Sequence, residues 1–283
     1  MNQANIAAMD LPTLMSVTPK PDAPEIFVGQ PESYGAIGIY GGHFVGQALA
    51  AGFKTISDDK LAQSLHCYFL KGGNPKEPIE YHVEKLRDGR TSSTRAITGF
   101  QAGEKVFHMI AAFKLPEDGE SHQKTAPPVI SPEALSKQRE QEGTRFKPPM
   151  LVEDRAELLL ISDHFVPEKF EHGREPELQS WMRSTHKGDI SAQSAQCVIA
   201  FLSDGFLMFN SVLPYGIPFQ SHRLTSLDHS VWFHRTCPAE EWMLYDQRSI
   251  AAVDGRGLNE GEIFNSCGLL VCSTKQESML RKI

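Results

Sequence analysis

The sequence predicts an α+β fold of two tandem units, each an antiparallel sheet wrapped around one helix, in a single chain. Three observations support this prediction: the composition is globular, a proline-rich segment divides the chain, and each half contains one helix followed by several strands. Of the 283 residues, 40% are hydrophobic and 22% are charged, which is typical of globular proteins and not of disordered ones. A helix with an apolar stripe must bury that stripe, and an antiparallel sheet offers the surface for it.

Charge and hydropathy exclude several classes of protein. The net charge is −7, from 28 basic and 35 acidic side chains. Nucleic-acid binders usually carry a basic face, so we expect no nucleic-acid partner. The longest uninterrupted apolar run covers residues 197–202, which is far shorter than the roughly 20 residues of a membrane span. The five cysteines form no CxxC pair, which favours reduced thiols in a reducing compartment.

The two ends of the chain bear on localisation. Residues 1–27 lack the basic start and apolar block of a secretory signal, and they contain Asp10 but no arginine, unlike a mitochondrial presequence. The last residues, Arg281-Lys282-Ile283, are similar to a peroxisomal tripeptide, but Arg281 stands where a small residue is expected. We therefore expect a cytoplasmic protein, with peroxisomal targeting as the alternative.

A connector separates the two halves. Six of the 18 prolines lie between Pro116 and Pro149, and proline cannot donate a hydrogen bond to a sheet. Ser131 and Pro132 have the residue types of a helix cap and first helical position, which predicts one short helix to about Glu142. The predicted domains are therefore residues 1–115, a linker at 116–150, and residues 151–283.

The first half contains one predicted helix and four predicted strands. Gly41-Gly42 precede a helix at 43–57, where apolar residues recur at helical spacing. Small residues in this helix, Gly46 and Gly52 among them, suit close packing on a sheet. The strand-like segments that follow are 64–70, 79–86, 92–100 and 105–114.

The second half repeats this order, with a helix at 191–210 and strands at 226–234, 242–249, 258–264 and 269–280. At offsets of 164 to 166 residues, Tyr68-Phe69 falls on Trp232-Phe233 and Asp88-Gly89-Arg90 falls on Asp254-Gly255-Arg256. Chance matching of common residues is the alternative, but the collinear order favours duplication. Two such units side by side would join their sheets and remove one exposed edge from each.

Asp204 is the unusual residue of the second helix, because residues 197–209 are otherwise apolar or small. A helix that is apolar all round is buried, and burying a carboxylate without partners costs several kcal/mol. The residue could cap a kink at Gly205 or pair with a buried arginine. It could also be a general base whose pKa desolvation raises into a useful range.

The duplication draws attention to two further polar residues. Gln276 falls on Ala111 at an offset of 165, and Ser226 falls on Ala62 at an offset of 164. A site that diverged in one half would show this contrast between polar and small apolar residues. The alternatives are a solvent-facing glutamine and an ordinary serine at a strand end.

Several stretches resemble the acyl-CoA thioesterase II family, which includes bacterial and peroxisomal enzymes. The resemblance runs from about Phe27 to the end of the chain. It is carried by Gly41-Gly42-His43-Phe44-Val45-Gly46-Gln47-Ala48-Leu49, Tyr68-Phe69-Leu70, Leu86-Arg87-Asp88-Gly89, Ser203-Asp204, Ser226-Leu227-Asp228-His229-Ser230-Val231-Trp232-Phe233-His234 and Ser273-Thr274-Lys275-Gln276-Glu277. The resemblance implies a double hotdog fold and hydrolysis of acyl-CoA thioesters.

The family's catalytic Asp, Thr or Ser, and Gln match Asp204, Ser226 and Gln276. The resemblance therefore implies that Asp204 accepts a proton from a water that Ser226 and Gln276 orient. The start of the first helix, with Gly42, is a candidate to stabilise the oxyanion, because helix N-termini present free N–H groups. His43 departs from several relatives, which carry Gln there, and we expect Gly42 and His43 to contact substrate.

Other functions are less well supported. A non-catalytic acyl-CoA binder would be expected to lose one of the three polar residues. A hotdog hydratase or dehydratase needs a histidine close to the aspartate, and none follows Asp204 until His222. His229 and His234 are interpreted as hydrogen-bonded packing residues. Asp163, His164 and His172 are better explained as loop residues than as a metal site, so we expect no metal and no cofactor. A homo-oligomer, dimer or tetramer, is expected from the family.

Overall fold

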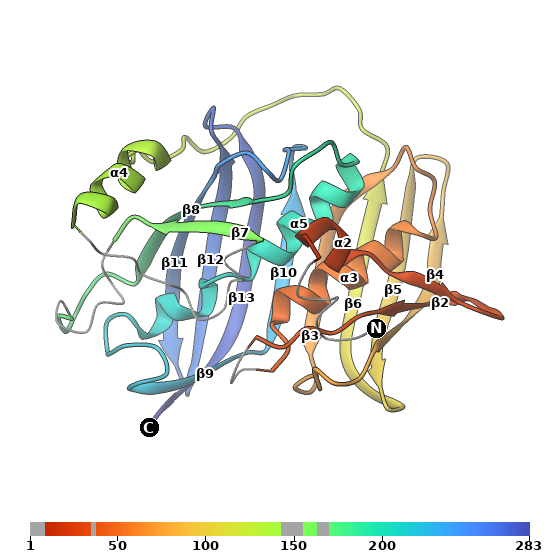
Figure 1. Cartoon of the computed structure of the whole chain (residues 1–283), viewed down its shortest axis with the longest axis horizontal. Coiled ribbons are helices and arrows are strands. Elements are labelled where there is room, and N and C mark those ends of the chain that lie inside the picture. Colours follow the sequence, from red (N-terminus) through yellow and green to blue (C-terminus); the bar gives the residue numbers. More distant parts are fainter. Residues whose placement is uncertain (1–8, 35–37, 143–154, 163–169) are drawn as a thin grey trace.

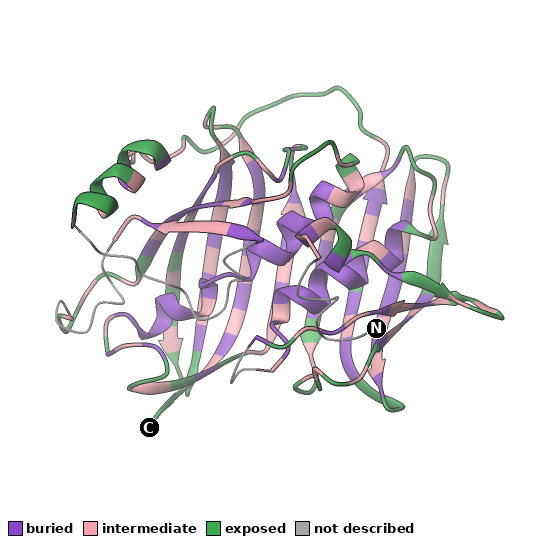
Figure 2. Ribbon diagram, viewed as in Figure 1, coloured by how far each residue is buried: buried purple, intermediate pink, exposed green. Residues whose placement is uncertain are grey.

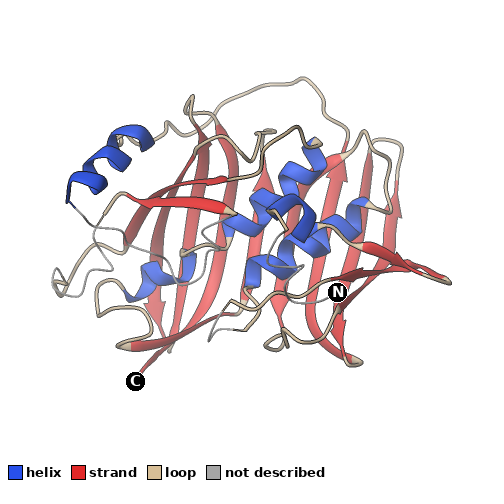
Figure 3. Cartoon of the chain, viewed as in Figure 1, coloured by secondary structure: helices blue, strands red, loops and turns tan. Residues whose placement is uncertain are grey.

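The computed structural model of the chain describes residues 9–34, 38–142, 155–162 and 170–283. In these residues the strands form one 13-stranded sheet, with the central helices on one of its faces (Figures 1 and 3). The strands of the first half are β1 (Thr18–Lys20), β2 (Ala23–Gly29), β3 (Leu61–Phe69), β4 (Ile79–Asp88), β5 (Ser92–Gln101) and β6 (Glu104–Lys114). Those of the second half are β7 (Ala156–Leu160), β8 (Glu177–Ser184), β9 (His222–Ser226), β10 (Asp228–Phe233), β11 (Met243–Val253), β12 (Arg256–Asn265) and β13 (Leu270–Lys282).

The sheet confirms the duplication. Its order is β4-β5-β6-β3 in the first half and β10-β13-β12-β11 in the second, so each half mirrors the other about the β3–β10 junction. These two strands are antiparallel, and His66 of β3 pairs with Ser230 of β10. Ser230 is also the residue that corresponds to His66 at the duplication offset of 164. The halves are therefore related by an approximate twofold axis at this pair. The predicted joining of two sheets is confirmed.

Helix α3 (Gly41–Phe53) and helix α5 (Ala192–Ser203) form the centre of the core, and both are buried along most of their length (Figure 2). Two glycines of α3 allow close approach to α5. A Cβ at Gly42 would lie 2.2 Å from Phe201 O, and one at Gly46 would lie 2.9 Å from Cys197 O. The expectation that Gly46 serves helix–sheet packing is therefore wrong, because its neighbour is the other helix. Gly52 does face the sheet, because a Cβ there would lie 2.9 Å from Phe113 Cζ.

The second helix is shorter than predicted. We expected one helix over 191–210, but α5 ends at Ser203 and a 3₁₀ helix, η3 (Leu207–Val212), follows a break. Phe206 is left-handed, with φ of 62°. The break leaves carbonyls without helical partners, and two side chains of β11 satisfy them. The Tyr245 hydroxyl donates to Ser203 O at 2.6 Å, and Gln247 Nε2 donates to Gly205 O at 2.7 Å.

The stretch Ala192–Val212 is also the one helical segment of the described residues that is long and apolar enough to span a membrane. Its most apolar window is 94% buried inside the protein. A core helix passes the same compositional test, so burial by the protein's own sheet accounts for its hydropathy.

The connector contains the predicted helix α4 (Pro132–Glu142), and Ser131 caps it by accepting from the N–H of Ala134 at 3.3 Å. In Figure 1 the chain arches from β6 over the molecule to α4. The first predicted domain boundary falls directly after β6. The second, at residues 150 and 151, lies outside the described residues. The predicted segments do not include the short helix α2 (Leu11–Met15) or the strands β1, β2, β7 and β8, and the predicted strand 226–234 covers only the last residue of β9.

Candidate active site

Asp204 lies where α5 ends, at the junction of the two halves. Its side chain is only 5% exposed, yet both carboxylate oxygens have a donor. Oδ2 accepts from the backbone N–H of Gly42 at 2.8 Å, and Oδ1 accepts from Nε2 of Gln276 at 2.5 Å. The first donor comes from the start of α3 in the first half and the second from β13 in the second half. The sequence-based alternative of a buried arginine partner is not what the structure shows; amide donors hold this carboxylate.

Burial controls the acidity of this carboxylate. Desolvation raises the pKa of Asp204 from 3.8 to about 7, although the hydrogen bonds from Gln276 and Gly42 oppose the rise. Tyr40, Cys67 and Tyr245 interact electrostatically with it. Burial raises the pKa of each of these three groups well above its usual value, so all three are neutral near pH 7. Asp204 can therefore gain or lose a proton at neutral pH while these neighbours stay uncharged.

A pocket of about 410 Å³ opens beside the carboxylate. It combines an apolar wall with polar groups at the end of α5 and on β9. Its lining residues include Ile39, Tyr40, Gly41, Phe44, Phe69, Leu70, Asp204, Met208, Phe219, Leu224, Thr225 and Ser226. An apolar pocket with a few convergent polar groups is the usual form of a small-molecule site. This one could hold an apolar chain next to a carboxylate of near-neutral pKa.

Ser226 lines this pocket but does not contact the other two predicted catalytic residues. It is half-buried, and its hydroxyl faces Sδ of Met208 at 3.6 Å, a weak contact. Among the described residues no hydrogen bond joins Ser226 to Asp204 or Gln276. The neighbouring Thr225 is exposed. The structure thus brings Asp204 and Gln276 into direct contact and places Ser226 on the wall of the same pocket.

Gln276 is fully buried on β13. Its Nε2 lies 2.5 Å from Asp204 Oδ1 and 3.4 Å from Nδ1 of His229. Its Oε1 has no hydrogen-bond partner. The alternative that Gln276 faces solvent is therefore wrong. An amide oxygen without a partner inside a protein is costly, and it leaves one buried acceptor next to the carboxylate, behind the residues that line the pocket.

The two expected substrate-contacting residues have different surroundings. The Gly42 N–H is bonded to Asp204, while Gly41 lines the pocket. The His43 ring is fully buried between the Tyr34 hydroxyl, 3.1 Å from Nδ1, and Gln30 O, 2.9 Å from Nε2. Burial lowers the pKa of His43 to about 4. His43 is not among the residues that line the pocket, so its observed contacts are those of a packing residue.

Sequence reasoning did not connect His229 and Ser203 to the site. His229 Nε2 lies 2.9 Å from Ser203 Oγ, and both side chains are fully buried. The interpretation of His229 as a hydrogen-bonded packing residue agrees with this, but it missed the contact with Gln276. A signal was available: His229, Val231 and Phe233 alternate on the core-facing side of β10, which places a polar ring among apolar ones.

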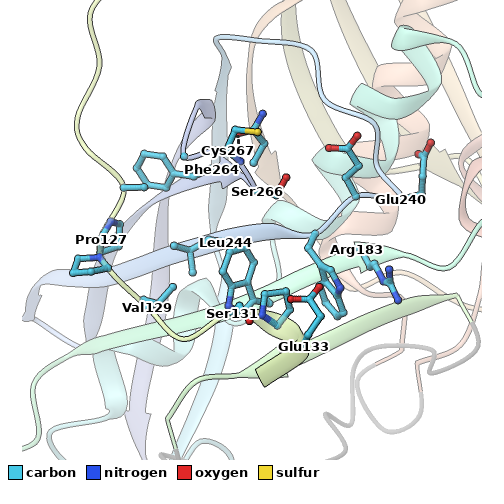
Figure 4. Close-up of a pocket in the computed structure, with 18 residues that line it drawn as sticks. Pro127, Val129, Ser131, Glu133, Arg183, Glu240, Leu244, Phe264, Ser266 and Cys267 are labelled. Atoms are coloured by element: carbon cyan, nitrogen blue, oxygen red, sulfur yellow. Dashed lines mark hydrogen bonds between the residues drawn. The ribbon is translucent and has the colours of Figure 1, made fainter. Parts of the chain in front are cut away.

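A larger pocket, of about 860 Å³, lies elsewhere on the molecule (Figure 4). It forms where the connector crosses the outer face of the second half, and it is lined by Val129, Trp181, Leu244 and Phe264 among others. The indole N–H of Trp181 donates to Ile130 O at 2.8 Å. This contact attaches the connector to β8. None of the predicted site residues lines this pocket.

The expectation of no metal concerns Asp163, His164 and His172. Asp163 and His164 lie outside the described residues. In the part of the chain that the structure describes, no group of three or more His, Cys, Asp or Glu side chains is arranged to hold a metal ion.

Two helix-wrapped antiparallel sheets, joined edge to edge in one chain, define a double hotdog protein. Comparison with known proteins agrees: a conserved protein of unknown function with hot dog fold from Alicyclobacillus acidocaldarius superimposes with a TM-score of 0.78 over 96% of this chain and 97% of that one, at 18% identity. The acyl-CoA thioesterase II TesB2 from Mycobacterium marinum gives a TM-score of 0.79 at 28% identity, covering 96% and 98% of the two chains.

Sequence comparisons identify the family. The model of the acyl-CoA thioesterase N-terminal domain matches residues 30–114, and that of the C-terminal domain matches residues 132–280. Acyl-CoA thioesterase 2 from Haemophilus influenzae is 31% identical over 90% of this chain and 92% of its own length. Acyl-coenzyme A thioesterase 8 from Rattus norvegicus is 34% identical over 86% of this chain and 80% of its own length. The chain belongs to the acyl-CoA thioesterase family and is a thioester hydrolase.

Proposed function

We propose that the chain hydrolyses acyl-CoA to a free fatty acid and CoA with a water molecule that Asp204 activates. The observation that carries this proposal is a buried carboxylate with a pKa of about 7 that opens onto an apolar pocket. A general base is most effective when its pKa is near the working pH. The apolar wall offers a place for the acyl chain, so the thioester carbonyl would lie close to the carboxylate.

Each step has a residue that could perform it. Asp204 takes one proton from the water, and the unpartnered Oε1 of Gln276 accepts a hydrogen bond from the O–H that remains, so that a lone pair of the water faces the carbonyl carbon. The Ser226 hydroxyl, which the weak contact with Met208 leaves free to rotate, donates to the water oxygen. The C–O bond forms as the water attacks, and the C–S bond breaks when the tetrahedral intermediate collapses. The proton held by Asp204 then passes to the departing thiolate.

The negative oxygen of the intermediate requires a donor. The Gly42 N–H already serves Asp204, so we propose the N–H of Gly41, the first residue of α3, which lines the pocket. Helix N-termini favour negative charge because their first N–H groups lack helical partners. This assignment modifies the sequence-based expectation for Gly42, whose role becomes the orientation of the carboxylate.

The decisive experiment compares wild-type protein and Asp204→Asn for release of CoA from palmitoyl-CoA, detected with a thiol reagent. We expect turnover to fall by about 10²-fold or more, because Asn keeps the shape and removes the base. The wild-type kcat/KM should rise about tenfold per pH unit below pH 7 and level off above it, because the deprotonated carboxylate is the active form. Near-wild-type turnover by folded Asp204→Asn protein would contradict the proposal.

Direct attack by Asp204, through an anhydride, is the competing mechanism. A single turnover in ¹⁸O-labelled water tests it, because label in Asp204 can come only from an anhydride that water opens at the Asp204 carbonyl, whereas direct water attack never labels the protein. The proposed orientation of water by Gln276 favours the second outcome. Family membership favours hydrolysis over the hydratase and the non-catalytic binder.

We further propose that the protein acts in the cytoplasm, with the peroxisome as the alternative, and assembles as a homo-oligomer. Support for assembly comes from the sheet face opposite the helices, where Tyr68 and Ile110 are exposed on the neighbouring strands β3 and β6. Exposed apolar groups that cluster on one face often mark contact surfaces.

A further inference from the structure

The Gln276 amide has two neighbours that constrain its orientation. One is Asp204, whose Oδ1 lies 2.5 Å from Nε2 of Gln276. The other is His229, whose Nδ1 lies 3.4 Å from the same nitrogen. The amide can serve both only if Nδ1 of His229 is an acceptor, because Nε2 of Gln276 is a donor.

A chain of contacts behind His229 determines which ring nitrogen carries the proton. Ser203 Oγ lies 2.8 Å from Ala200 O and 2.9 Å from His229 Nε2. A carbonyl oxygen cannot donate, so the Ser203 hydroxyl proton must point to Ala200 O. The oxygen of Ser203 then accepts from Nε2–H of His229, which leaves Nδ1 without a proton and able to accept.

We propose that His229, held in this tautomer by Ser203, is a positioning residue that keeps Nε2 of Gln276 on Asp204 and Oε1 free for the reacting water. This inference rests on the proposed function. With the opposite tautomer, Nδ1–H would meet the amide N–H₂ group, and the amide would turn its oxygen toward the carboxylate. Asp204 would lose a donor and face an oxygen instead.

The surroundings support a neutral ring. His229 is fully buried, and burial lowers its pKa to about 3, so the ring stays uncharged over the working range. Among the described residues, Tyr40, Cys67 and Tyr245 interact electrostatically with Asp204, from the loop before α3, from β3 and from β11, and Lys71 lines the same pocket. The first three stay neutral near pH 7, so a change in the pH midpoint of the reaction reports on the donors of Asp204.

Two substitutions of similar size test the acceptor. His229→Asn retains an acceptor, because its Oδ1 is attached to Cγ as Nδ1 is in histidine. His229→Leu removes it. For His229→Leu we expect kcat/KM at pH 7 to fall about tenfold and its pH midpoint to rise by about 0.5 unit or more, because loss of a hydrogen bond to the charged form raises a carboxyl pKa. KM should change little, and His229→Asn should keep a midpoint close to that of wild type.

Equal pH midpoints for the two variants would overturn the proposal, whether both shift or neither does, since a packing role does not depend on an acceptor. A second measurement does not need activity. In wild-type protein with ¹⁵N-labelled histidine, long-range ¹H–¹⁵N NMR, assigned by comparison with His229→Asn, should show a neutral Nε2–H ring at pH 6. An Nδ1–H ring or a charged ring would contradict the inference. Absence of wild-type turnover would refute the proposed function, and this spectrum would still test the tautomer.

Discussion

The acidity of Asp204 couples the stability of the protein to pH. Its pKa is about 7 in the folded protein, against an ordinary value of 3.8. Between these two values the folded chain holds a proton that the unfolded chain has lost. The free energy of unfolding therefore falls as the pH rises through this window, and the loss is complete above pH 7.

Asp204→Asn should remove this dependence, because a neutral amide does not ionise. We expect the difference in unfolding free energy, variant minus wild type, to be about 2 kcal/mol larger at pH 8 than at pH 5. Urea unfolding of both proteins at the two pH values measures it. An identical difference in unfolding free energy at both values would show that the carboxylate is already ionised at pH 5.

Ser226 and Thr225 form a matched pair of neighbouring hydroxyl residues on β9. Ser226 is half-buried and Thr225 is exposed. Ser226→Ala should lower kcat by about tenfold or more, because the reacting water loses a donor, whereas Thr225→Ala should be mild. Steady-state kinetics with palmitoyl-CoA tests this, and a larger effect at Thr225 would reverse the assignment. Combining Ser226→Ala with Asp204→Asn should cost much less than the two separate effects together, because both act on one water.

The sequence reveals some of these residues and hides others, for a physical reason. Asp204 stands out because a charge in an apolar helix is expensive, and Gln276 stands out because its duplicate is Ala111. His229 gives a weaker signal, its place among apolar residues on the core-facing side of β10, and its role depends on Ser203, which is distant in the sequence. His43 matched a family position next to the site, yet the direction of its side chain turns it away from the pocket.

At the scale of elements, the contact between α3 and α5 sets the distance from Gly42 to Asp204. Gly42 and Gly46, one helical turn apart, face Phe201 O and Cys197 O. Backbone carbonyls inside a helix cannot move aside independently. The spacing of the two helices therefore depends on the absence of side chains at these two positions.

Gly46→Ala should lower the free energy of unfolding by about 1–3 kcal/mol, the usual range for overpacking a core. Its Cβ would lie 2.9 Å from Cys197 O and 2.2 Å from Met15 Sδ. Gly119→Ala is the control, because a Cβ there meets no atom within 4 Å. Denaturant unfolding of the two variants compares them, and equal stabilities would show that the helices separate without cost.

The elements also show where sequence patterns fail. Apolar spacing continues past Ser203, so a single helix over 191–210 was a reasonable prediction. The break depends on Tyr245 and Gln247, which bind the freed carbonyls. These partners lie about 40 residues away in the sequence, and helical periodicity carries no information about them. Strands β3 to β6 could be predicted because half-buried strands alternate, whereas β1 and β7 are short and lie at the two ends of the sheet, and β2 lies next to β1.

At the scale of the whole molecule, the approximate twofold axis gives the pocket of Asp204 a counterpart at the other ends of the helices. The residue that follows α3 there is Lys54, in the position that Asp204 has after α5. Ala62 and Ala111, the duplicates of Ser226 and Gln276, are both buried. The counterpart therefore has a lysine in the position of Asp204 and alanines in the positions of its two polar partners.

Introducing one of these groups should not create a second site. Ala111→Gln in the Asp204→Asn background should leave CoA release at the level of Asp204→Asn alone, because Lys54 stands where the second half has its carboxylate. The same assay with palmitoyl-CoA measures this. Recovery of turnover would mean that the first half can support the reaction independently of Asp204, which would contradict the prediction.

The hydrogen bond from Gly42 to Asp204 has a consequence for biosynthesis. The donor belongs to the part of the chain that the ribosome makes first, and the acceptor belongs to the part made later. A nascent first half contains no carboxylate for the reaction, and an undocked second half leaves that carboxylate in water, where it would be an ordinary weak base. On the mechanism proposed above, hydrolysis therefore begins only after both halves have been made and have docked.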